Sequence, residues 1–220
     1  MHTKSNCKIA PAGKTLGCLL ILAASSSGCQ QMAIVWANLT GGETIEAQYT
    51  LTKGPLFVFI DDRDGLVDEP KAIREVHATI SEIFRKENVN HRVIPFADWR
   101  HLQQSERKYR GMTIQAVGEK LGADQVLYVR IDQFSLQSEA GAPLFKGEFI
   151  ARVKVLSTER EVSVIRLWPR EERGHRVAAS TRPVSTDGDK TAADVADELG
   201  KRLGWEIAGL FYDHKEFADK

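Results

Sequence analysis

The residues with the clearest chemical potential follow an apolar run early in the chain. Residues 56–60 read Leu-Phe-Val-Phe-Ile, the pattern of a strand covered on both faces, and aspartates stand at positions 61, 62, 64 and 68 directly after it. Aspartate side chains can act as nucleophiles, as general acids and as ligands of Mg²⁺. They also cap loops and helix N-termini, where the helix dipole favours negative charge. We expect residues 61–68 to form an acidic loop of this capping kind.

The same segment resembles the first motif of haloacid-dehalogenase-type phosphatases, a strand that ends in Asp-x-Asp-Gly. The resemblance implies that Asp62 attacks phosphorus, that Asp64 acts as general acid, and that both help to hold Mg²⁺. Gly188-Asp189 with Asp194 would imitate the acidic metal motif of that family. The chain lacks the Thr that normally follows Asp-x-Asp-Gly, and the Lys-bearing and Ser/Thr motifs have no counterpart. The phosphatase is therefore the alternative, and the capping loop is favoured.

Other catalytic patterns do not occur in the sequence. The six histidines are scattered, without the spacing that metal ligands show, and neither a Gly-x-Ser-x-Gly elbow nor a phosphate-binding Gly-x-x-x-x-Gly-Lys loop is present. The four tryptophans are spread along the chain and are typical packing anchors. We expect no metal site, no cofactor and no enzymatic activity.

The amino terminus has the three parts of a signal peptide. Lys4, Lys8 and Lys14 form a positive region without acidic residues, residues 16–24 are apolar, and residues 25–29 read Ser-Ser-Ser-Gly-Cys. The apolar run is shorter than the roughly 20 residues that a transmembrane helix needs. The sequence therefore predicts a removable leader over residues 1–28.

The end of the leader resembles the lipobox of bacterial lipoproteins. Gly28 and Cys29 match that pattern and Ser27 is acceptable, whereas Ser26 stands where Leu is usual, so cleavage by an ordinary signal peptidase is the alternative. The resemblance implies that Cys29 carries lipid and holds the protein at a membrane. Gln30, in place of Asp, weakly favours the outer membrane by the sorting preference of enteric lipoproteins.

Cysteine content and charge exclude two further kinds of function, cysteine-based sites and nucleic-acid binding. All three cysteines lie within the first 29 residues, so no disulfide or cysteine-based site can form after Cys29. Removing residues 1–28 takes away three lysines and no acidic residue, which leaves a net charge of −3 on the mature chain. A mildly acidic chain lacks the electrostatic footprint of a nucleic-acid-binding protein.

Hydrophobic periodicity predicts three helices, at about 70–88, at 113–122, and from 191 to beyond Leu210. Strands are expected at 56–60, 91–96, 125–131, 145–155 and 162–169, and the first is expected in the middle of the sheet. Residues 97–110 and 170–190 receive no assignment. We expect the apolar stripe of the last helix to be part of the core, with a docking surface as the alternative: Val195, Leu199, Leu203, Ile207 and Leu210.

This order, β-α-β-α-β-β-β-α, predicts an α/β fold that leans toward α+β. It has a single mixed sheet with helices packed on it, parallel in its first half and antiparallel in its second. The expected organisation is a signal peptide over 1–28, lipidated Cys29 with a tether over 29–54, a globular domain over 55–212 and a polar tail over 213–220.

Residues 55–212 resemble a group of envelope lipoprotein domains, which includes the curli-secretion channel lipoprotein, the lipoprotein activators of peptidoglycan synthases and the amino-terminal domain of the Tol translocation protein. The crispest shared motif is Leu121-Gly122-Ala123-Asp124, where a helix ends and a strand begins. Phe211-Tyr212-Asp213-His214 and Trp168-Pro169 also resemble an uncharacterised family of bacterial secreted lipoproteins. The resemblance implies a non-catalytic protein-interaction or assembly module in the periplasm-facing cell envelope, with an envelope protein as partner.

Overall fold

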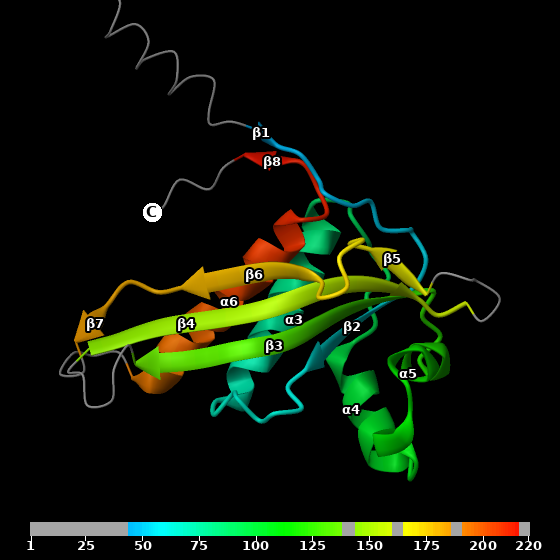
Figure 1. Cartoon of the computed structure of the whole chain (residues 1–220), viewed down its shortest axis with the longest axis horizontal. Coiled ribbons are helices and arrows are strands. Elements are labelled where there is room, and N and C mark those ends of the chain that lie inside the picture. The colour runs from blue at the N-terminus through cyan, green and yellow to red at the C-terminus, as the bar shows by residue number, and fades with distance from the viewer. Residues whose placement is uncertain (1–43, 138–143, 160–164, 186–190, 216–220) are drawn as a thin grey trace, which may run out of the picture. The chain divides into compact units, whose positions relative to one another are not determined.

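The first strand of the main sheet is the apolar run that precedes the acidic loop (Figure 1). The computed structural model describes residues 44–137, 144–159, 165–185 and 191–215, so Cys29, the predicted leader and Gly188-Asp189 lie outside the described residues. Residues Glu46–His214 form one compact unit. Strands β1 (Thr44–Ile45) and β8 (His214–Lys215) form a separate two-stranded sheet.

The main sheet is mixed. Its strands are β2 (Leu56–Asp61), β3 (Gln125–Gln137), β4 (Leu144–Ser157), β5 (Arg166–Trp168), β6 (His175–Ser180) and β7 (Val184–Ser185). Strand β3 runs parallel to β2 and antiparallel to β4. The three short strands β5, β6 and β7 pair with successive stretches of the other edge of β4, all antiparallel.

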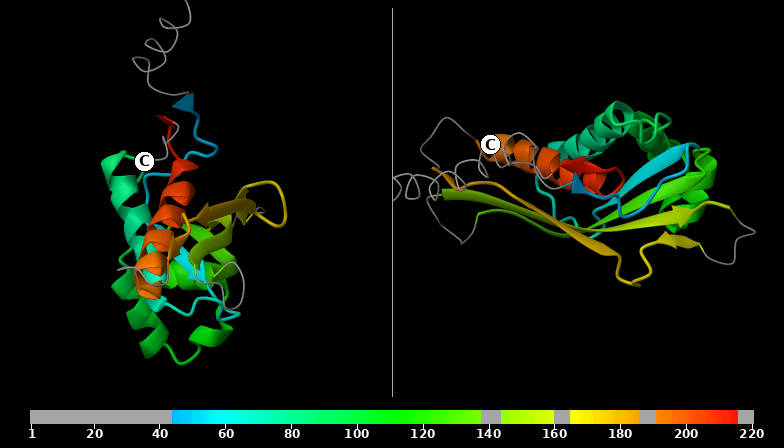
Figure 2. Two further views of the ribbon diagram at one scale, coloured as in Figure 1. Left: turned by 90° about the vertical axis from the view of Figure 1, so that its left-hand side faces the viewer. Right: turned by 90° about the horizontal axis from the view of Figure 1, so that it is seen from above.

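The helices cover the two faces of the sheet unequally. They are α3 (Pro70–Lys86), α4 (Phe96–Ser105), α5 (Ile114–Lys120) and α6 (Ala192–Gly209), with a 3₁₀ turn at Tyr109–Gly111. Figure 2 shows α3 and α6 together on one side of the sheet, where they bury residues from β2, β3, β4 and β6. Helices α4 and α5 pack on the opposite face, over β2 and β3 and against Leu156 of β4. Within the described ranges, no helix is both long enough and apolar enough to cross a membrane.

Local signals in the sequence account for where the helices begin. The Thr113 hydroxyl accepts a hydrogen bond from the backbone N–H of Ala116 and so caps α5. Thr191 and Asp194 form a reciprocal capping box at the start of α6. Pro70 occupies the first turn of α3, where its missing N–H costs nothing. The capping position is Glu69, and its side chain makes no capping hydrogen bond.

The predicted fold class is confirmed: helices pack on one mixed sheet, parallel between β2 and β3 and antiparallel beyond. The apolar stripe of the last helix is confirmed as core, since all five of its residues are buried: Val195, Leu199, Leu203, Ile207 and Leu210. Four of them lie in the cluster that joins α3 and α6 to the sheet: Leu199, Leu203, Ile207 and Leu210. The buried stripe is therefore not available as a docking surface.

Two local predictions were wrong. Strand β2 lies at one end of the sheet instead of its middle; its residues are apolar because helices cover both of its faces, which does not require a neighbouring strand on each edge. Residues 91–96 contribute a single bridge, between Val93 and Leu56, and Phe96 already begins α4. Pro95, which has no N–H to donate to a ladder, stands at the helix start.

Two segments left without assignment hold regular structure. Residues 97–110 lie mostly in α4, which anchors Trp99 against Phe57 and Phe59 of β2. Residues 170–190 contain β6, whose alternate residues Val177 and Ala179 are buried. Both segments are rich in charged and polar residues, and this composition conceals their apolar positions.

Residues 47–53, which we expected in the tether, contact the compact unit. Leu51 is part of the core, and the backbone N–H groups of Gln48 and Tyr49 donate to the carbonyl oxygen of Leu210. The Tyr49 ring also packs on Trp168. The domain boundaries themselves stay a prediction, but a soluble fragment that keeps these contacts has to begin before Ala47.

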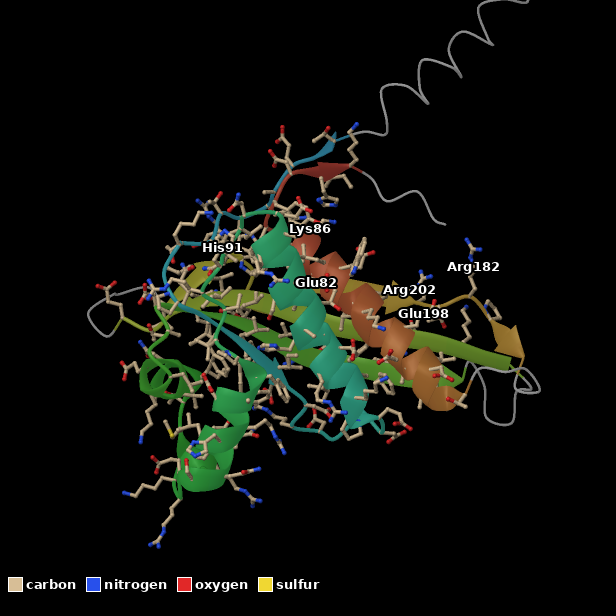
Figure 3. All side chains as sticks on the ribbon, turned by 180° about the vertical axis from the view of Figure 1, so that it is seen from behind. Glu82, Lys86, His91, Arg182, Glu198 and Arg202 are labelled. Atoms are coloured by element: carbon tan, nitrogen blue, oxygen red, sulfur yellow. The ribbon has the colours of Figure 1, made fainter. Side chains whose placement is uncertain are left out.

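Helices α3 and α6 approach each other closely because glycines lie at their contact. A Cβ atom at Gly200 would stand 2.6 Å from the carbonyl oxygen of Ala72, and one at Gly204 would stand 2.7 Å from the Thr79 side chain. The two glycines are four residues apart and so share one face of α6. Lys71 of α3 adds an ion pair to Asp197 of α6 at 2.9 Å. Figure 3 looks onto this helix pair, in front of the sheet.

We expect Gly200→Ala to destabilise the domain by about 1–3 kcal/mol, because the added methyl group would have to push α3 away. In an ordinary helix interior the same change stabilises by roughly 1 kcal/mol, so the sign is diagnostic. Chemical denaturation of the mature chain measures the effect. Gly111→Ala is the matched control, since nothing lies within 4 Å of its Cβ position, and we expect no loss there. Equal stability of the wild type and Gly200→Ala would contradict the close contact.

Candidate functional site

The Asp62 carboxylate is engaged by the backbone of its own loop. It accepts hydrogen bonds from the N–H groups of Leu66 at 2.8 Å and Val67 at 3.2 Å. These bonds fold the segment between β2 and α3 into a turn, which Gly65 completes with a positive φ of 63°. Asp62 therefore acts as the capping residue of an acidic loop, as the favoured interpretation of the sequence predicts.

Asp61 belongs to a buried polar network at the end of β2. It is only 8% exposed, and its Oδ2 accepts hydrogen bonds from the Tyr128 hydroxyl at 2.6 Å and from Arg63 Nη2 at 2.7 Å. Burial, followed by the hydrogen bond to Asp61, raises the pKa of Tyr128, so its hydroxyl remains a donor at neutral pH. The network ties β2 to β3 and keeps a buried carboxylate paired.

The other residues of the phosphatase pattern do not gather around Asp62. Asp64 is exposed on the same loop, and Asp194 is bound in the capping box of α6, where Thr191 donates to it through both N–H and hydroxyl. Within the described ranges, no three His, Cys, Asp or Glu side chains are placed to hold a metal ion. Gly188-Asp189, the rest of the imitated metal motif, lies outside the described residues.

The second concentration of functional groups is a row of arginines across the sheet. Pairing in register places Asp61 of β2 beside Arg130 of β3, Arg130 beside Arg152 of β4, and Arg152 beside Arg176 of β6. Residues paired in register point to the same face of a sheet, and neighbouring strands are about 4.8 Å apart. The row lies on the face away from α3 and α6, toward the viewer in Figure 1.

A bulge in β3 places a carboxylate within this row. The pairing of β3 with β4 shifts between Ile131 and Gln133, which makes Asp132 the extra residue. Its Oδ1 accepts from Arg130 Nη2 at 2.8 Å, and its Oδ2 accepts from Arg152 Nε at 2.6 Å. Asp132 thus fixes two arginines in one orientation and neutralises one of their two charges.

Further cations stand next to the row. Lys154 is two residues from Arg152 on the same face of β4, and Arg166 of β5 pairs with Leu156. Burial and the positive charges of Arg166, Arg130 and Arg152 lower the pKa of Lys154, with Glu172 opposing the shift. We call the set Arg130, Arg152, Lys154, Arg166 and Arg176 the cationic face. A planar guanidinium group binds phosphate or carboxylate through two parallel hydrogen bonds, so this face suits anionic groups.

A shallow pocket lies on the other side of the molecule, between the second half of α3 and the segment after it. It is lined by Ala78, Ser81, Glu82, Arg85, Asn90, His91 and Val93. Asn90 is already saturated, because it donates to the carbonyls of Thr52 and Gly54 and accepts from Arg92 N–H. Glu82 and His91, which also line this pocket, stand at the surface (Figure 3).

His77 is the most strongly perturbed histidine. It lies on α3, is 5% exposed, packs against the Phe96 ring and has Nδ1 3.4 Å from Ser81 Oγ. Burial lowers its pKa to about 4, and the backbone of Ile94 opposes part of the shift. Its role is packing between α3 and α4 in the neutral form, because the ring is buried against Phe96.

Comparison with known proteins supplies no family. No protein-family model matches the chain, and no curated protein matches it. Solved structures with a partly similar course of the chain include a PelC dodecamer from Paraburkholderia phytofirmans, at 11% identity and a TM-score of 0.36, covering 78% of this chain and 98% of that one. Lipoprotein GNA1162 from Neisseria meningitidis has 12% identity and a TM-score of 0.40, with 70% and 98% covered. Hypothetical protein CT253 from Chlamydia trachomatis has 13% identity and a TM-score of 0.39, covering 72% of this chain and 98% of that one. Likenesses at this level carry no functional inference.

The buried His77 makes the domain sensitive to mild acid. The unfolded chain binds a proton at this residue below about pH 6.5, whereas the folded chain does so only below about pH 4. The contribution of His77 to stability is therefore complete above about pH 6.5, the pKa in the unfolded chain. It decreases as the pH falls from about 6.5 to about 4, and at pH 5 the free energy of unfolding is lower by about 2 kcal/mol. We expect His77→Leu to remove this part of the pH dependence, measured as the change in unfolding free energy between pH 7 and pH 5. An identical change in both proteins would contradict the assignment.

Proposed function

We propose that this protein is a lipid-anchored component of the bacterial cell envelope that acts by non-covalent binding rather than by catalysis. The anchor is the lipid on Cys29, and the binding surface is the cationic face of the sheet. The observation that carries the proposal is this face itself: five cationic side chains from four strands, placed by the strand pairing on the side of the sheet away from α3 and α6.

The arrangement of the aspartates favours binding over phosphatase chemistry. A nucleophilic carboxylate needs an approach for the phosphorus atom and a metal ion beside it. Both Asp62 oxygens already accept backbone hydrogen bonds, and the buried Asp61 is paired with Tyr128 and Arg63. These carboxylates stabilise the loop and the strand end, which explains the motif without a reaction.

The sequence supports the anchor. The positive start, the short apolar run and the cysteine after Gly28 form one continuous signal, and the absence of cysteine after residue 29 suits an oxidising compartment. A chain held at a membrane meets partners at a high local concentration, so a modest binding face suffices for function. An envelope protein or an envelope surface is the corresponding partner.

We expect Cys29→Ala to release the protein from the membrane fraction or to leave it as an unprocessed precursor, since the acceptor of the lipid is lost. Fractionation and the mass of the product measure this outcome. Ser27→Ala is the matched control: alanine is also acceptable before the cleavage site, and membrane association should persist. Unchanged membrane association and mass in Cys29→Ala would refute the anchor.

We expect the purified mature chain to hydrolyse no chromogenic phosphate ester in the presence of Mg²⁺. Turnover that both Asp62→Asn and Asp64→Asn abolish would establish the phosphatase instead. Asp64→Asn is the cleaner variant because Asp64 is exposed, and its substitution should leave the melting temperature unchanged. Asp62→Asn is expected to lower the melting temperature, since it weakens the two hydrogen bonds that fold the loop.

A further inference from the structure

The cationic face ends at a sheet edge with exposed apolar residues. Ile165 and Leu167 flank Arg166 in and beside β5, and they are 47% and 36% exposed. Only two other large apolar residues are as exposed in the described part of the chain, Ile45 and Trp205. Basic and apolar side chains exposed together are the composition that binds the interface of an anionic membrane.

Charge is concentrated here against the trend of the whole chain. Residues 165–182 contain five arginines and two glutamates, although the mature chain carries a net charge of −3. Asp132 neutralises one charge in the row, Glu172 lies near Lys154, and Glu148 accepts a hydrogen bond from Gln133 further along β4. Arg176 is exposed, and Arg166 is half-buried and donates to the carbonyl oxygen of Glu172. The face is therefore locally positive on an acidic protein.

We propose that this face rests on an anionic membrane surface, where its arginines contact lipid phosphates and the β5 edge meets the headgroup region. The inference rests on the proposed lipid anchor, which would keep the domain within reach of such a surface, and adds to it a second, electrostatic membrane contact. One lipid signal combined with a basic patch gives more durable attachment than either alone.

The geometry favours a surface over a small soluble anion. Arg130 and Arg152 both donate hydrogen bonds to Asp132. These bonds hold the two guanidinium groups in fixed orientations, so the two groups do not converge on a single small ion. The row crosses the neighbouring strands β3, β4 and β6, so its cations are spread across the sheet. A planar array of phosphates can engage cations on adjacent strands simultaneously, which a single phosphate cannot.

The test uses the mature chain, residues 29–220, with Cys29→Ala, which lacks only the lipid. We expect it to sediment with vesicles of phosphatidylcholine and phosphatidylglycerol but not with phosphatidylcholine alone. Raising the salt from about 0.1 M to about 1 M, which shortens the Debye length from about 10 Å to 3 Å, should release it. Equal binding to both kinds of vesicle, or binding to neither, would overturn the proposal.

Paired variants locate the contact. We expect Arg166→Gln with Arg176→Gln to weaken vesicle binding about tenfold. The matched control is Arg74→Gln with Arg85→Gln, which removes the same charge from exposed positions on α3 and should leave binding unchanged. Ile165→Ser with Leu167→Ser should also weaken the binding at about 0.1 M salt, because the apolar contact with the headgroup region is lost. Equal weakening by the two arginine pairs would overturn the assignment to this face.

Two further arms separate this inference from its alternatives. Inorganic phosphate should compete only through ionic strength, so potassium phosphate and potassium chloride of equal ionic strength should release the protein equally; stronger competition by phosphate would indicate a site for the free ion instead. Loss of vesicle binding in this soluble chain leaves the Cys29 anchor unaffected, since fractionation of the lipidated protein tests that separately. Vesicle failure and anchor failure are thereby distinguishable.

Discussion

The glycine-mediated contact between α3 and α6 determines how the remaining surface of the sheet is used. Because Gly200 and Gly204 let the two helix backbones approach, α3 and α6 form one layer over β2, β3, β4 and β6. A single layer buries the inner side chains of all four strands. On the opposite face, α4 and α5 cover the apolar residues of β2 and β3 and contact Leu156 of β4. The outer side chains of β4 and β6 can be charged because the core is already complete without them.

The acidic loop illustrates how a motif can resemble a catalytic one and yet serve architecture. A strand that ends in several aspartates has to satisfy the N–H groups of the turn that follows, and a carboxylate does this well. Asp62 takes that task, while Asp61 turns inward to Tyr128. Buried carboxylates are expensive without partners, so the tyrosine and Arg63 are as necessary as the aspartate itself. The spacing of aspartates alone could not separate these two roles.

Much of the architecture was predictable from local signals, because those signals act over a few residues. The apolar run at 56–60, the cap at Thr113, the stop at Gly122 and the stripe from Val195 onward all appear in the structure. The arginine row was not predictable. The alternation of apolar and polar residues along 145–155 places Arg152 on the polar face of its strand. Only the pairing register brings Arg152 beside Arg130 and Arg176. Strand β6 lies in a segment whose polar composition concealed it. The glycine contact was not predictable either. Two glycines four residues apart indicate close helix packing only once a second helix is known to lie against them.

One border of the sheet consists of three short strands, which reduces the risk that copies of the protein crowded at a membrane pair with one another. Exposed strand edges are templates on which chains pair with one another and aggregate. Along β4 the partner is divided among β5, β6 and β7, of three, six and two residues, with turns between them. Among the described residues of this border, the unpaired backbone groups are thus divided among short strands, the longest of which is β6. Dividing this border among β5, β6 and β7 thus protects against self-association, although each strand then forms fewer hydrogen bonds with β4.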